Sequence, residues 1–261
     1  MSRFLAASLM LLVAPTSCVQ ETTPEPLKVV SWSGQDGKPV SLDQVLKIEF
    51  DRPLAQPLRA SSVELLDEGE HVVKGMDVSV VGRWIHLNPS LPLTADLDGG
   101  SLRPNSTYAI HLHGLPWLRA LTGEDGQRLP QDLALRFNTA KVDAPGALAG
   151  RGVESSTLQL HGGAGREPLV FQAEEPILLR FTRGLDPRSL EATATWRLQG
   201  QGEGVPVQLQ LLENRIDGAV MQVELDDWIG WGVLELPASL EGLGGWPLPQ
   251  GDRLLRLVRR G

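Results

Sequence analysis

The sequence predicts an all-β protein with two tandem β-sandwich domains behind an amino-terminal export signal. Three observations support this prediction. The 28 glycines and 19 prolines are spread along all 261 residues, which is typical of many turns between short strands. Several short stretches alternate apolar and polar residues, as half-buried strands do. A pattern in the first half of the chain recurs weakly in the second half, which indicates a duplicated unit.

The amino terminus has the features of an export signal. Arg3 is followed by an apolar run over residues 4–13, which is too short to span a bilayer and fits the core of a signal peptide. Ser17, a small residue, stands directly before Cys18. This arrangement resembles a bacterial lipoprotein signal, in which cleavage precedes the cysteine and the cysteine is diacylated. Pro15 departs from the family pattern, which has an aliphatic residue at that position.

The resemblance implies a signal peptide over residues 1–17, a lipid on Cys18, and a short Pro-rich tether over residues 18–26. Because Val19 rather than Asp follows the cysteine, it further implies anchoring in the outer membrane. Acyl chains give a stable anchor, since each buried CH₂ contributes about 0.8 kcal/mol. The alternative is a conventional signal peptide cut nearby, with Cys18 incidental.

Residues 27–140 are predicted to form the first sandwich domain. Alternation is clear in Val45–Phe50 and in Thr107–His113. Tyr108, at the start of a strand, is expected to pack its ring inward and to bond backbone at the sandwich corner. Five features in order make the domain similar to the SbsA-type bacterial Ig-like family of surface and envelope proteins: Phe50 before Asp51-Arg52-Pro53-Leu54, Ile85 to Pro89, Leu102 to Tyr108, the loop Gly123 to Leu129, and Phe137-Asn138-Thr139.

An Ala/Gly/Pro-rich linker is expected over residues 141–156, followed by a second, diverged Ig-like sandwich over residues 157–261. Ile177 to Pro187 parallels the first domain from Leu46 to Leu54. The second copy lacks the Phe-x-Thr ending and the tyrosine corner.

Composition excludes several classes of function. The net charge of −8 and the pI near 5.2 argue against a nucleic-acid partner, which requires a concentrated basic face. Because the only cysteine, Cys18, belongs to the targeting segment, the folded part has no disulfide and no nucleophilic or metal-binding thiolate. The serines lack a nucleophile elbow, so no hydrolase signature is present. The loop His161 to Gly165 is interpreted as a turn rather than an oxyanion or phosphate loop.

Two groups of residues are weak candidates for chemistry. His111 and His113 are two positions apart on a strand and so face the same side. With His86 on a neighbouring strand, they would give three metal-ligating imidazoles. Solvated or packed histidines are the favoured interpretation, so no metal and no cofactor are predicted. Acidic pairs could serve a glycosidase only if the two carboxylates faced each other across a cleft, and could bind calcium only with a repeated Asp-x-Asp spacing, which is absent. Their positions in expected turns explain them better. These pairs are Glu124/Asp125, Glu174/Glu175 and Asp226/Asp227.

Trp228, Trp231 and Trp246 lie among glycines near the carboxyl end and are the candidate ligand-binding residues. Core or inter-domain packing is the commoner explanation of such tryptophans. The function expected from the whole sequence is a non-enzymatic, lipid-anchored envelope protein that acts as a structural or protein-interaction module. The alternative is an envelope glycan-binding module that uses the three tryptophans, and a metal- or glycan-active enzyme is the least favoured class.

Overall fold

The computed structural model describes residues 24–59, 61–144, 146–149, 158–161, 167–172, 175–199, 202–225 and 230–260. Nearly all regular structure in this part is β, as predicted. The strands are β1 (Val29–Trp32), β2 (Leu46–Phe50), β3 (Val63–Leu66), β4 (Met76–Val81), β5 (Trp84–Pro89), β6 (Thr107–Leu112), β7 (Leu133–Asn138), β8 (Leu169–Gln172), β9 (Ile177–Phe181), β10 (Ala194–Leu198), β11 (Val205–Arg215), β12 (Gly218–Glu224), β13 (Gly230–Glu235), β14 (Glu241–Gly242), β15 (Trp246–Pro247) and β16 (Leu254–Arg260).

Helical structure in the described residues is limited to the 3₁₀ turn η1 (Pro187–Glu191) and the single turn α1 (Gln250–Arg253). Neither of them has the length and apolar character needed to cross a membrane.

Strands β1–β7 form what we call the N-terminal unit. Its two sheets have the orders β1-β2-β5-β4 and β3-β6-β7, and all their pairings are antiparallel. Strand β2 shows why the sequence folds this way: Leu46, Ile48 and Phe50 are fully buried, whereas Lys47 and Glu49 point to the other face. One face of each sheet therefore contributes to a shared apolar core.

Strands β8–β16 form the C-terminal unit. Seven of them are hydrogen-bonded in the order β8-β16-β13-β10-β11-β12-β9, and β14 pairs with β15. Strand β11 joins the two parts of this sheet, because its first residues pair with β10 and the remainder with β12. The β8–β16 pairing is parallel. A second apolar core, which includes Phe181, Trp196 and Met221, lies inside this unit.

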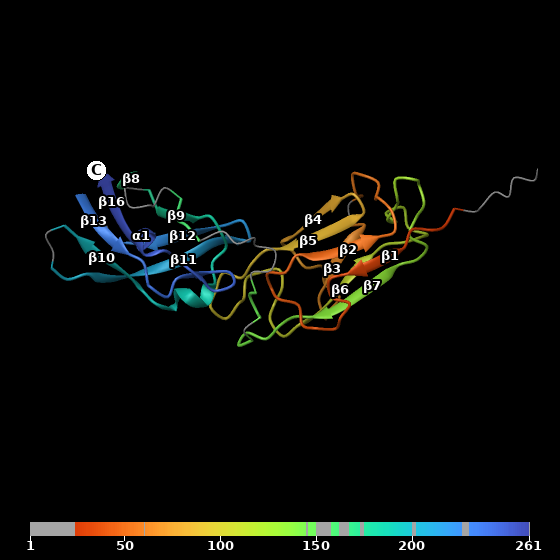
Figure 1. Cartoon of the computed structure of the whole chain (residues 1–261), viewed down its shortest axis with the longest axis horizontal. Coiled ribbons are helices and arrows are strands. Elements are labelled where there is room, and N and C mark those ends of the chain that lie inside the picture. The colour runs from red at the N-terminus through yellow and green to blue at the C-terminus, as the bar shows by residue number, and fades with distance from the viewer. Residues whose placement is uncertain are drawn as a thin grey trace, which may run out of the picture.

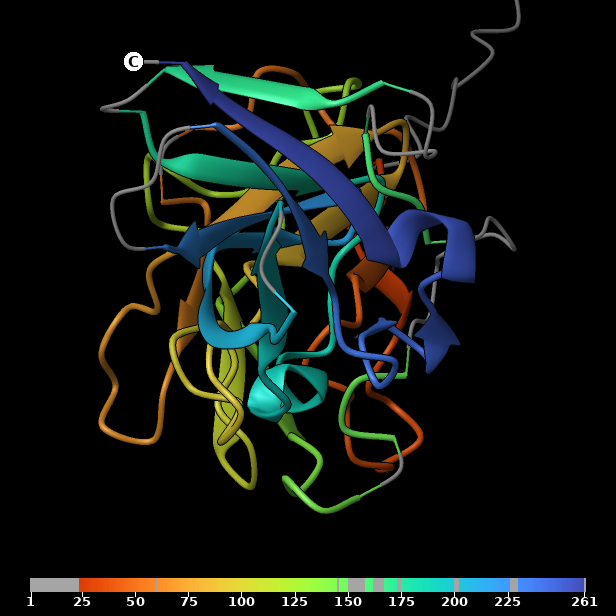
Figure 2. The same cartoon turned by 90° about the vertical axis from the view of Figure 1, so that its left-hand side faces the viewer.

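The two units lie end to end along the longest axis of the molecule (Figure 1). The described chain enters beside β1 at one end, and β16 ends at the opposite end. Seen along that axis from the C-terminal unit, the N-terminal unit lies directly behind it (Figure 2). From the segment predicted as a linker, Ala147 and Leu148 are buried in the core of the N-terminal unit. The boundaries at residues 140 and 157 stay predictions.

The junction between the units combines apolar packing with buried hydrogen bonds. Leu243 joins the core of the N-terminal unit, and Leu93 packs against the core of the C-terminal unit. Asn214, near the end of β11, is 3% exposed. Its amide accepts a hydrogen bond from the Leu185 N–H and donates to the carbonyls of Leu185 and Pro92, each at 2.9 Å. One side chain thus connects backbone segments of both units.

The predicted tyrosine corner is confirmed. Tyr108 is buried, its ring stacks on Phe137 with centroids 5.7 Å apart, and its hydroxyl accepts a hydrogen bond from the Arg103 N–H at 2.8 Å. We expect Tyr108→Phe to lower the free energy of unfolding by about 1–2 kcal/mol, because it leaves the Arg103 amide without its partner. Urea unfolding of both proteins measures the effect. An unchanged unfolding midpoint would show that the hydroxyl does not stabilise the corner.

Candidate functional site

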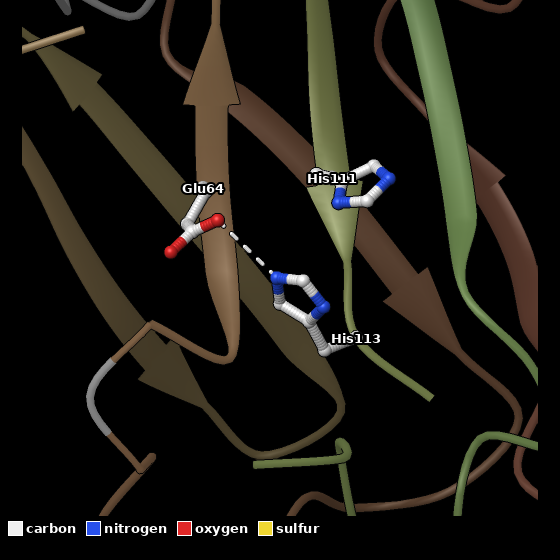
Figure 3. Close-up of side chains that lie close together, drawn as sticks. All are labelled: Glu64, His111 and His113. Atoms are coloured by element: carbon white, nitrogen blue, oxygen red, sulfur yellow. Dashed lines mark hydrogen bonds and ion pairs between the residues drawn. The ribbon is translucent and has the colours of Figure 1, made fainter. Parts of the chain in front are cut away.

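The outer face of the β3-β6-β7 sheet brings together one carboxylate and two imidazoles. Glu64 on β3 is directly opposite His111 on β6, and His113 follows the last residue of β6. One potential ligand atom from each of the three side chains lies within 4.8 Å of the others. The side chains converge at one end of this sheet (Figure 3). The prediction that His111 and His113 face the same side is confirmed, because their ring centroids are 5.0 Å apart.

The centre of this group is the buried ring of His113. Only 4% of its side chain is exposed, and its Nε2 lies 3.2 Å from Glu64 Oε2. The other Glu64 oxygen, Oε1, accepts a hydrogen bond from Arg119 Nη1 at 3.2 Å. Glu64 is itself 19% exposed. Arg119 also lies over the Trp117 ring, 5.6 Å from its centroid, so an exposed loop packs against the group.

Asp132 faces the opposite nitrogen of His113. Its carboxylate accepts hydrogen bonds from the Gly114 N–H at 2.8 Å and from the Trp117 indole N–H at 3.1 Å. Burial raises the pKa of Asp132, but these two hydrogen bonds and the nearby imidazoles outweigh it, and the net effect lowers the pKa. His113 Nδ1 is buried, has no hydrogen-bond partner among the described residues, and lies 3.7 Å from Asp132 Oδ2.

The suggestion that His86 joins the other histidines is wrong. His86 lies on β5, whose partners β2 and β4 belong to the other sheet of the N-terminal unit. The residues that complete the group are Glu64 and Asp132, which sequence reasoning missed. Glu64 is 49 residues from His113, and the β3–β6 register that brings them together leaves no local signal.

The candidate tryptophans are on separate elements where the structure describes them. Trp231 lies on β13 in the seven-stranded sheet and is 43% exposed. Trp246 lies on β15 of the two-stranded β14–β15 sheet and is 46% exposed. Trp228 lies outside the described residues. Two of the three candidate indoles are therefore exposed, and they lie on two different sheets.

Some of the acidic candidates lie within the described residues and others lie outside them. Glu124 and Asp125 lie in a turn, as predicted, and Asp125 pairs with Arg52 at 2.5 Å. Glu175 accepts a hydrogen bond from the Gln172 N–H at 3.1 Å. The partner positions Glu174, Asp226 and Asp227 are outside the described residues, as are residues 162–166 after His161 and the proposed lipid site Cys18.

No protein-family model matches the chain, and no curated protein matches its sequence. Among solved structures, it is similar to the N-terminal part of the bacterial S-layer protein SbsC, with 11% identity and a TM-score of 0.32, over 91% of this chain and 45% of that one. It is also similar to the full extracellular region of plexin A4, with 13% identity and a TM-score of 0.25, over 90% of this chain and 24% of that one. The chain therefore spans less than half the length of either, and these similarities assign no activity or partner.

Proposed function

We propose that this chain is a non-enzymatic, lipid-anchored protein of the cell envelope, with its two units acting as SbsA-type Ig-like domains in a structural or protein-interaction module. The observation that carries the proposal is the end-to-end arrangement of the units. The described residues begin beside β1 at one end of the long axis, and β16 lies at the other (Figure 1). A membrane anchor before residue 24 would hold the N-terminal unit near the lipid and present the C-terminal unit away from it.

The junction supports this role because a spacer must resist bending. A flexible connection would let the outer unit fold back towards the membrane. Here Leu243 lies in the core of the N-terminal unit, Leu93 packs against the core of the C-terminal unit, and the Asn214 side chain hydrogen-bonds to backbone of both units. A second polar contact, from Arg188 Nη1 to the Val142 carbonyl at 3.2 Å, lies across the same junction.

The anchor is tested by comparing the native protein with Cys18→Ser in membrane fractionation and intact mass. We expect the wild type to carry acyl mass and to sediment with outer membrane, and the Cys18→Ser protein to be unacylated and soluble, because two or more acyl chains are needed for stable anchoring. If both proteins are soluble and neither carries acyl mass, the anchor is rejected and a diffusible periplasmic or secreted protein is favoured.

A second candidate function, binding of envelope glycan, is favoured by the exposure of Trp231 and Trp246. Flat indole faces are suited to stacking on sugar rings. Soluble cell-wall fragments should then quench tryptophan fluorescence, and the replacements Trp231→Ala and Trp246→Ala should reduce the quenching. An unchanged emission spectrum across a panel of such fragments would exclude this candidate.

A further inference from the structure

The group of Glu64, His111 and His113 has the donor set of a transition-metal site. Two imidazole nitrogens and one carboxylate oxygen are ligands that zinc prefers, and three protein ligands leave a fourth position of the tetrahedron open. Glu64 and His111 lie on the paired strands β3 and β6, and His113 is the first residue after β6, so the sheet holds their backbones in place. Strands hold metal ligands in position more precisely than loops do.

The distances suit a small ion with little rearrangement. Ligand atoms about 2.0–2.1 Å from zinc are about 3.3 Å apart in a tetrahedron. His113 Nε2 and Glu64 Oε2 are already 3.2 Å apart. All three ligand atoms lie within 4.8 Å of one another, and the half-buried His111 side chain is the one that would turn towards the other two. The same partial exposure leaves a route by which an ion enters.

A second, independent observation is the environment of His113. Its side chain is more than nine-tenths buried, and its Nδ1 has no hydrogen-bond partner among the described residues although Asp132 Oδ2 is 3.7 Å away. A metal-ligating histidine commonly directs its second ring nitrogen at a carboxylate, which fixes the tautomer and strengthens the ligand. Asp132 is positioned for this role by the Gly114 and Trp117 N–H groups.

From these contacts we propose that Glu64, His111 and His113 bind one divalent ion of the zinc class, with Asp132 orienting His113. Arg119 holds Oε1 of Glu64, so the carboxylate coordinates through Oε2 alone, and the positive guanidinium reduces the affinity from what an isolated His₂Glu site would have. The site goes beyond the spacer function, which needs no metal. Leu115, Trp117 and Leu118, in the loop after His113, have exposed side chains.

The test is zinc titration of the full chain by calorimetry, with Cys18→Ser in every sample and without a histidine tag. This removes the only cysteine and leaves no thiolate to compete. His111→Gln tests the site, because His111 is half-buried on an outer face and its replacement is compatible with folding. His86→Gln is the matched control, since His86 is equally a half-buried histidine on the outer face of the other sheet. Glu64→Gln is a second test that keeps the side-chain shape.

We expect the Cys18→Ser protein to bind about one zinc per chain and to melt at a higher temperature when zinc is present, because an ion that binds only the folded state stabilises it. His86→Gln should behave identically, whereas His111→Gln and Glu64→Gln should bind at least about tenfold more weakly. Equal zinc binding by His111→Gln and His86→Gln would overturn the proposal. So would a folded Cys18→Ser protein that binds no zinc at about 100 μM, because an ion stabilises the folded state only where its concentration exceeds the dissociation constant of the site.

Discussion

Replacement of Asn214 by Ala is expected to destabilise the junction between the units by about 3 kcal/mol, because a buried amide donor and two carbonyls lose their partners at once. The amide of Leu185 and the carbonyls of Leu185 and Pro92 would be left unpaired in a site where Asn214 is 3% exposed. Calorimetric unfolding should change from one transition, or two closely coupled ones, to two separated transitions. Urea unfolding monitored by fluorescence measures the loss of stability.

Asn138→Ala is the matched control for this prediction. Asn138 is the last residue of β7, and its side chain is exposed rather than buried between the units. Its replacement should change the free energy of unfolding by no more than about 0.5 kcal/mol. If Asn214→Ala behaves like Asn138→Ala, the buried amide does not join the units and the apolar contacts alone hold them together.

Gly114→Ala is expected to have an effect of similar size, about 3 kcal/mol or more, because the clash is with backbone. A Cβ at this position would lie 2.2 Å from the Gln131 carbonyl oxygen and 2.3 Å from its carbon. No rotamer change relieves a contact of this kind. The segment after His113 must instead move away from the start of β7, which also breaks the bond from the Gly114 N–H to Asp132.

Gly251→Ala is the control for the glycine replacement. A Cβ at Gly251, in α1, meets no atom within 4 Å, so the added methyl group should cost nothing and slightly favour the helical turn. Thermal unfolding of the two variants beside the wild type decides the matter. A melting temperature for Gly114→Ala within about one degree of the wild type, which corresponds to well under 1 kcal/mol, would contradict the predicted clash.

Local patterning was enough to predict the β class and several individual strands. Alternation in β2 and β6 reports burial on one face, and a turn before Tyr108 indicates the corner that the hydroxyl closes. These features depend on residues that are near one another in the chain. These features can therefore be predicted without knowing which strands pair.

The candidate site depends on pairing, which the sequence does not encode locally. Whether His86 lies beside His111 depends on the order of strands in the sheets, which local patterns do not give. In the structure, the His86 strand β5 pairs with β2 and β4, in the other sheet. Glu64 joins His111 only through the β3–β6 register, and Asp132 reaches His113 across the β6–β7 connection. In the sequence alone, neither carboxylate differs from an ordinary surface acidic residue.

Asn214 was missed for a related reason. In sequence it is one polar residue near the end of a long alternating strand, where a solvated turn is the natural interpretation. Its burial arises only because the β11–β12 hairpin end meets the Leu91–Leu93 segment of the other unit. An inter-unit contact of this kind requires the arrangement of both units, which periodicity does not supply.

The central claim is that the two units act as one rigid spacer, and small-angle X-ray scattering of the soluble Cys18→Ser protein tests it most directly. The account predicts a single elongated particle whose scattering profile matches the end-to-end arrangement in Figure 1. A profile that requires an ensemble of two units moving independently about the junction would contradict it, because a flexible connection cannot hold the outer unit at a fixed distance from the membrane.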